Sequence, residues 1–156
     1  MKILILGLIF GSISFLGFKI GNAFKEKEVF YYDFKNFLIY LKSEIGFFRR
    51  DIVEIIEAYQ TKNKNIIMLL GNFKQSLNGE NFQKINILSD SENAKIGEFF
   101  KGVGVSDCDS QKEYIEKNIE IFSKSYEDAK QQNLKQGIMY KKLSILVGIL
   151  VCIILI

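Results

Sequence analysis

Paired carboxylates are the first groups in this sequence that could do chemistry. Glu54 and Glu57 lie one helical turn apart, a spacing that suits a metal site or a general acid and base. Pairs of this kind usually lie on solvated helix faces. The sequence contains no His, which removes Ser-His and Cys-His nucleophile pairs and the commonest metal ligand. We therefore expect a protein that is not an enzyme, with no catalytic residue, metal or cofactor.

Two short patterns contain other groups that could bind a ligand. The run 102–104 is Gly-Val-Gly, part of a glycine-rich phosphate loop, but no strand precedes it and no Gly-Lys-Ser/Thr follows. It is typical of the end of a helix. The run 107–109 is Asp-Cys-Asp, which places hard and soft ligands too close together to form a site alone. Cys108 and Cys152 are far apart in the chain, so no disulfide framework is expected.

The last stretch of the chain, 110–156, begins as an amphipathic helix and ends as an apolar tail. Apolar residues recur at steps of four and three, which places them on one helical face; they are Ile115, Ile119, Phe122, Tyr126 and Ala129. From Leu143 onward no residue is charged, which predicts a membrane segment, 143–156, of about 21 Å. Because it is short, it needs snorkelling by Lys141 and Lys142 or help from 138–140. The alternative is a short core helix.

The first stretch is also apolar. Ile3 to Phe24 would form about 33 Å of helix, enough to cross a hydrocarbon core of about 30 Å. The alternative is a cleaved signal peptide with Gly-Asn-Ala at 21–23 as its cleavage site. The positive charges of Lys19, Lys25 and Lys27 favour an uncleaved anchor. The predicted domains are an N-terminal transmembrane anchor at 1–24, a helical domain at 25–142 and the C-terminal segment.

The distribution of charged residues predicts on which side of the membrane the middle of the chain lies. All 18 acidic residues and all but two of the 21 basic residues lie between residues 25 and 142. Such a near-neutral domain lacks the basic stripe of a nucleic-acid binder. Lysines cluster on its side of both apolar segments, so the positive-inside rule predicts a cytoplasmic domain with both termini outside. A homo-oligomer is possible.

The first part of the middle carries a heptad-like apolar seam, which consists of Phe34, Leu38, Leu41, Ile45, Phe48, Ile52, Ile55 and Tyr59. Further apolar residues widen it, as in a helix packed within a bundle. We interpret the seam as core, and the flank with Tyr40, Phe47 and Arg50 as the favoured partner surface.

The rest of the middle predicts further helices. Ile66 to Leu77 follow helical spacing and end at a turn pair, 78–79, and 82–87 is a weak short helix. Ser89 and Glu92 fit a capping box. Asp107, or Ser110 with Glu113, would cap the last long helix. With no strand-like alternation and no proline, the predicted fold class is all-α: a helical bundle between two apolar segments.

In this order and spacing the motifs resemble those of the stage III sporulation protein AB family of endospore-forming bacteria. The run 41–48, with Leu41, Glu44, Ile45 and an aromatic pair ending in Phe48, is similar to the family's Leu-x-x-Glu-Ile motif. The run 51–55 keeps the acid of Pro-Leu-x-Glu-Ala as Glu54 and loses its proline. The run 99–111 looks like the central motif and carries Phe99, Gly104, Asp107 and Gln111, with Phe100 replacing a glycine. The C-terminal match runs through Ala129, Gly137, Lys141, Leu143 and Gly148, with Ser144 replacing a glycine.

The resemblance implies a platform component of the secretion-like channel that joins mother cell and forespore during endospore development. It implies a location in the mother-cell membrane, contacts with the other channel proteins, and a domain similar to those of the F-type platform protein of type II secretion and type IV pilus machines. A secretion-type ATPase would be a partner. The alternative function is a two-anchor membrane protein that acts as a chaperone or sensor.

Glu44 is the ionisable residue among the fixed positions of the family's Leu-x-x-Glu-Ile motif, and it lies beside the seam. Two roles remain open from the sequence. The carboxylate could form an intrachain pair, or it could be held at the domain edge for another protein.

Overall fold

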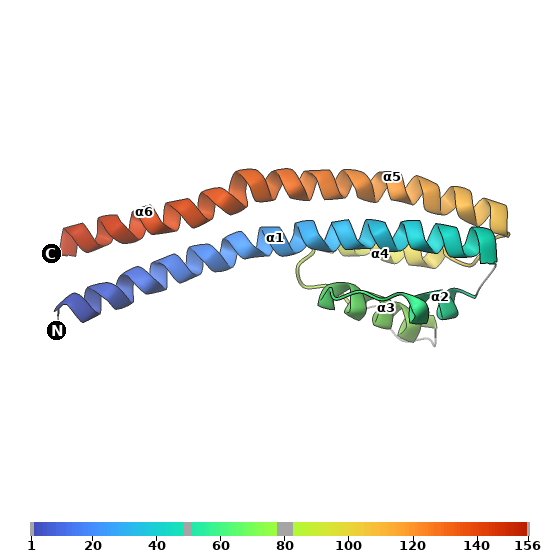
Figure 1. Ribbon diagram of the computed structural model, residues 1–156, viewed down its shortest axis with the longest axis horizontal. Helices are drawn as coiled ribbons and strands as arrows, with labels where there is room; N and C mark the ends of the chain where they lie inside the picture. The colour runs from blue at the N-terminus through green and yellow to red at the C-terminus, as the bar shows by residue number, and fades with distance from the viewer. Residues whose placement is uncertain (1, 49–50, 78–82, 156) are drawn as a thin grey trace. The chain divides into compact units, whose positions relative to one another are not determined.

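The computed structural model describes residues 2–48, 51–77 and 83–155. The helices are α1 (Lys2–Phe48), α2 (Ile52–Ala58), α3 (Lys64–Leu77), α4 (Asp90–Gly102), α5 (Cys108–Gln132), the π-helix η1 (Asn133–Gly137) and α6 (Ile138–Leu155) (Figure 1). No strand occurs among the described residues. The predicted all-α class, with an apolar helix at each end, is confirmed.

The chain divides into two compact units. The terminal unit contains Met1–Glu28 and Glu127–Ile156, and the central unit contains Val29–Tyr126. Helices α1 and α5 each contribute residues to both units. The domain boundaries predicted at residues 24 and 142 mark where the chain would enter the membrane. The two units are defined by packing instead, so these boundaries stay predictions.

An aromatic cluster forms the core of the central unit. The ring of Phe34 on α1 lies edge-on to Phe122 of α5 at 4.8 Å and to Phe99 of α4 at 5.9 Å, between ring centroids. Phe73 brings α3 onto the same cluster by stacking on Phe100 at 4.3 Å. Such pairs contribute about 0.5–1.5 kcal/mol each beyond the burial of their area. The apolar face predicted for 34–45 is therefore the core of this unit.

The seam does not run through one helix, as its even spacing suggested. Helix α1 ends at Phe48, and α2 begins at Ile52 with Asp51 as its N-cap. Asp51 has extended backbone angles, φ −63° and ψ 144°, and its Oδ1 accepts a hydrogen bond from the Val53 amide at 3.3 Å. A capping side chain thus starts the new helix where the family motif has proline. Arg50, a residue of the predicted flank, lies outside the described residues, and so do the side chains of Phe47 and Phe48.

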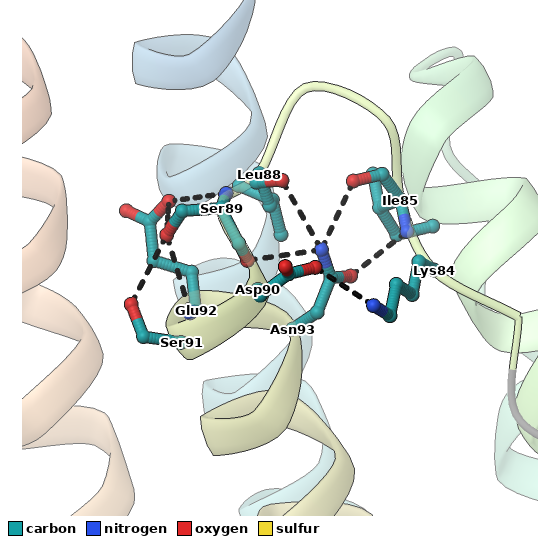
Figure 2. Close-up of polar contacts among 8 residues, drawn as sticks. All are labelled: Lys84, Ile85, Leu88, Ser89, Asp90, Ser91, Glu92 and Asn93. Atoms are coloured by element: carbon teal, nitrogen blue, oxygen red, sulfur yellow. Dashed lines mark hydrogen bonds and ion pairs between the residues drawn. The ribbon is translucent and has the colours of Figure 1, made fainter.

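The short helix expected at 82–87 is wrong for the described residues 83–87, which form a loop. The buried side chain of Asn93 holds this loop. Its Oδ1 accepts from the Ile85 amide at 2.8 Å, and its Nδ2 donates to the carbonyls of Ile85, Leu88 and Ser89 (Figure 2). These bonds satisfy buried backbone groups that a helix would otherwise have paired with one another.

The start of α4 has the capping box that the sequence predicted. The Ser89 hydroxyl accepts from the Glu92 amide, and the Glu92 carboxylate accepts from the Ser89 amide at 2.8 Å (Figure 2). The same carboxylate accepts a hydrogen bond from the Tyr31 hydroxyl of α1. Burial of Tyr31, followed by the negative charge of Glu92 and this bond, raises the pKa of the phenol strongly. The capping residue therefore also fixes α4 against α1.

The terminal unit is an antiparallel hairpin of the first part of α1 with η1 and α6 (Figure 1). A Cβ on Gly21 would lie 2.7 Å from the carbonyl oxygen of Gly137, and one on Gly148 would lie 2.8 Å from the ring of Phe10. At Gly21 the neighbouring atom belongs to the backbone, so only glycine allows the two helices to approach so closely there. By length and composition, the helical stretches Leu4–Gly46 and Cys108–Leu155 could each cross a membrane.

The stretch 110–156, predicted as an amphipathic helix followed by an apolar tail, contains the π-helical turn η1. It begins at Asn133, whose side-chain amide donates to Glu28. A Cβ on Gly137, the last residue of η1, would meet the Asn133 Oδ1 at 2.5 Å and the Phe24 Cβ at 3.2 Å. A π turn inserts one extra residue into a helix. Here the π turn begins at the residue that bonds to Glu28, and it ends immediately before α6, which packs against α1 through Gly148.

Candidate interaction site

A cavity of about 470 Å³ lies in the central unit, where the end of α1 meets the starts of α2 and α5. We call it the α5 pocket. Its lining residues are Ile45, Asp51, Ile52, Gly104, Ser106, Asp107, Cys108, Asp109 and Gln111. Four of these, Ile45, Gly104, Asp107 and Gln111, are among the residues singled out from the sequence. The fold thus brings residues from two distant sequence motifs into one place.

Asp107 is the N-cap of α5, and this result decides between the two caps proposed from the sequence. Its carboxylate accepts a 2.7 Å hydrogen bond from the Ser110 hydroxyl and 3.1 Å bonds from the amides of Ser110 and Asp109. The hydroxyl bond first, and then the amide bonds, lower the pKa of Asp107 below its usual value. The carboxylate is thus committed to starting the helix.

Gln111 organises the loop that forms one wall of the pocket. The side chain is 4% exposed. Its Oε1 accepts from the Gly104 amide at 3.1 Å, and its Nε2 donates to the Gly102 carbonyl at 3.0 Å and the Ser106 hydroxyl at 2.9 Å. Gly104 has φ +83°, a conformation that other residues rarely adopt. The glycine pair predicted to end a helix therefore does so, with one amide closing the turn.

Cys108 joins the pocket to the end of α1. Its thiol donates a hydrogen bond to the Ile45 carbonyl at 3.3 Å. The last carbonyls of a helix have no partner within that helix, so this bond satisfies one of them. The Asp-Cys-Asp run thus supplies a helix cap and a link to α1.

The α5 pocket combines acidic and apolar side chains. Asp51 and Asp107 are helix caps, and the exposed Asp109 forms an ion pair with Lys112 at 3.3 Å. Ile45 and Ile52 supply an apolar part of the lining. Within the described part of the chain, no group of three or more His, Cys, Asp and Glu side chains could hold a metal ion. The arrangement presents apolar surface edged by acidic groups.

The remaining candidate residues of the central unit lie outside the α5 pocket. Leu41 and Phe99 are 1% exposed and belong to the core, and Glu44 is buried at 9% exposed. Burial favours the intrachain role for Glu44 of the two that the sequence left open. Glu54 is exposed on α2, and its neighbour Glu57 forms an ion pair with Lys74 of α3.

The C-terminal candidates belong to the hairpin of the terminal unit. Gly137 and Gly148 lie against the first part of α1. The Lys141 ammonium lies 6.0 Å from the ring centroid of Phe18, and Ala129 is 3% exposed. Sequence reasoning missed the partner surface, which is centred on Gly17 and Gly21. The Gly-x-x-x-Gly spacing in an apolar helix was the signal that could have found it.

Comparison with known proteins gives one finding. The family profile for stage III sporulation protein AB matches residues 2–156. The chain belongs to the stage III sporulation protein AB family. No curated protein and no solved structure matches the chain significantly. As a member of the stage III sporulation protein AB family, it is a sporulation-related protein, and the resemblance drawn from its motifs is confirmed.

Proposed function

We propose that this protein is a non-enzymatic platform component of the channel between mother cell and forespore, required for endospore development. Family membership over residues 2–156 carries the proposal. The two apolar helical stretches support insertion into a membrane. In this proposal the protein lies in the mother-cell membrane, with its central unit in the cytoplasm.

The α5 pocket is the proposed docking surface for another protein of the apparatus, and a secretion-type ATPase is the proposed partner. Support comes from its concave form, from the apolar surface of Ile45 and Ile52, and from the rim carboxylates of Asp51 and Asp109. Desolvated apolar surface with a polar rim is the usual anatomy of a protein interface. The resemblance to the F-type platform proteins motivates the choice of partner.

Deleting the gene tests the channel role. We expect the deletion to stop development after the forespore has formed and to lower the yield of spores strongly. The full chain, expressed from the mother-cell genome, should restore the yield, whereas residues 29–126 alone should not. A normal spore yield in the deletion would contradict the proposal and favour a chaperone or sensor role outside the channel.

Photo-crosslinking tests the docking surface. A photoreactive amino acid at Val105, which is 77% exposed and next to the pocket residues Gly104 and Ser106, should capture an ATPase in sporulating cells. The matched control places the same group at Ile67 of α3, which is 55% exposed and does not line the α5 pocket. Equal capture at both positions, or capture at neither, would argue against the pocket as the docking surface.

A further inference from the structure

A second concave surface runs along one face of η1 and α6 in the terminal unit. Its cavity is about 360 Å³, and we call it the α6 groove. It is lined by Leu134, Lys135, Ile138, Met139, Lys142, Leu143 and Leu146. From Leu134 to Leu146 the groove extends for about 18 Å at 1.5 Å per residue.

The α6 groove combines an apolar floor with two cations. Ile138, Met139 and Leu143 are 40–50% exposed. Lys135 and Lys142 line the same groove and are exposed, and neither forms an ion pair with any described residue. No acidic residue follows Asp128 in the sequence. The groove therefore offers two ammonium groups without a direct ion pair among the described residues; the nearest preceding acid, Asp128, lines a neighbouring cavity that includes Lys135.

A membrane-spanning α6 would place the α6 groove at the edge of the bilayer. Helix α6 has 18 residues, or about 27 Å, which approaches the roughly 30 Å of a hydrocarbon core. With α6 inserted, Lys135 and Lys142 lie on the side where the chain enters the membrane, and Leu143 and Leu146 lie deeper. Lysines at such a boundary extend their ammonium groups toward lipid headgroups.

We propose that the α6 groove binds one anionic phospholipid of the surrounding bilayer. The lipid phosphate lies between the ammonium groups of Lys135 and Lys142, and an acyl chain follows the floor past Leu143 to Leu146. A lipid without net charge would bind less well, because its headgroup carries no net negative charge to balance the two ammonium groups. A second copy of the chain docked symmetrically on this face would bring its lysines against these two, which disfavours that occupant.

The test uses the full chain in detergent and native mass spectrometry. The probes are phosphatidylglycerol and phosphatidylcholine with identical acyl chains, added in equal amounts. We expect phosphatidylglycerol to be retained in preference, with one lipid per chain. The double variant Lys135→Gln/Lys142→Gln should weaken its retention roughly tenfold or more, since each lysine near an anionic surface contributes about fivefold.

The matched control is Lys117→Gln/Lys124→Gln, which removes two exposed lysines with the same seven-residue spacing from α5. It should retain the lipid, as should Lys135→Arg/Lys142→Arg. Circular dichroism should give equal helix content for all variants. Free glycerol phosphate should not displace the lipid, because it has no acyl chain to fill the floor. Equal retention of both lipids, equal loss in the control, or displacement by glycerol phosphate would overturn the proposal.

Discussion

The side-chain amide of Asn133 donates a 2.6 Å hydrogen bond to the carboxylate of Glu28, across 105 residues of sequence. The same carboxylate pairs with Lys25 at 2.9 Å, and the Glu28 side chain is 13% exposed. Asn133 is the first residue of η1, so the bond ties the start of the π-helix to α1. A hydrogen bond to a charged group in a shielded place stabilises more than a neutral one.

Replacing Asn133 should weaken the hairpin. Asn133→Leu leaves the shielded Glu28 carboxylate with one hydrogen-bond donor fewer, which should lower the free energy of unfolding by about 1–3 kcal/mol. Denaturant unfolding of the full chain in detergent measures the change. Gln132→Leu, at the exposed neighbouring position, is the control. Equal stability of the two variants would show that the bond contributes nothing.

Charges placed in the central core should unfold it. Leu41→Asp and Phe122→Asp each bury a carboxylate at a site that is at most 2% exposed, which costs several kcal/mol unless the group becomes neutral. Both variants should be depleted in cells and lose their near-ultraviolet circular dichroism. Ile39→Asp and Ile121→Asp change residues of the same helices that are 49% and 44% exposed, and should fold. If all four variants lost the folded structure, the introduction of Asp into a helix, rather than the burial of its charge, would explain the unfolding.

Glu44 can be assigned by measuring two quantities on one variant. If its carboxylate is structural, as its burial favours, Glu44→Gln should lower the free energy of unfolding by about 1–3 kcal/mol. If it serves a partner, unfolding should be unchanged while crosslinking from Val105 decreases. No change in either quantity would remove Glu44 from the list of functional residues.

Stability should fall at high pH because of Tyr31. Burial, and then the charge and hydrogen bond of Glu92, raise the pKa of this phenol in the folded state above the ordinary value of 10.0. The contribution of Tyr31 to the free energy of unfolding is therefore complete below about pH 10. It is lost as the pH rises further, because the Tyr31 phenol ionises in the unfolded chain and stays neutral in the folded chain. Unfolding of Tyr31→Phe should depend less on pH above 10 than that of the natural chain. Tyr59 and Tyr114, whose pKa values burial also raises, contribute to the dependence that remains.

Membrane topology is tested with reporters. A reporter fused after Lys74 should behave as cytoplasmic, and one fused after Ile156 should behave as external. The reason is that lysines lie on the central-unit side of both apolar segments, and the positive-inside rule predicts that this side is cytoplasmic. An external signal after Lys74 would instead favour the signal-peptide interpretation of the first segment.

Features set by neighbouring residues could be predicted from the sequence. The capping box of Ser89 and Glu92 needs only a three-residue spacing, and the caps at Gly104 and Asp107 are equally local. The apolar faces of α1 and α5 follow from helical periodicity. These elements were therefore predicted correctly from their own residues.

Features set by distant residues could not be predicted. The seam spacing continues through residues 49–51, so periodicity alone cannot reveal that Asp51 starts a new helix. The loop at 83–88 depends on Asn93, and η1 lies where Asn133 meets Glu28. The α5 pocket combines Ile45 with residues of 51–52 and 104–111, which become neighbours only in the folded chain.

The glycine contacts of the hairpin keep a fixed register. The Cys152 thiol faces the Leu6 carbonyl, Gly148 faces Phe10, and Gly137 faces Gly21, so every step along α1 is matched by an equal step back along α6. Sliding one helix by a single residue would place a larger side chain where a glycine is required. The glycine contacts therefore favour this register over a slide along the helix axes. We therefore expect force on the hairpin to tilt or rotate the two helices together rather than to slide one past the other.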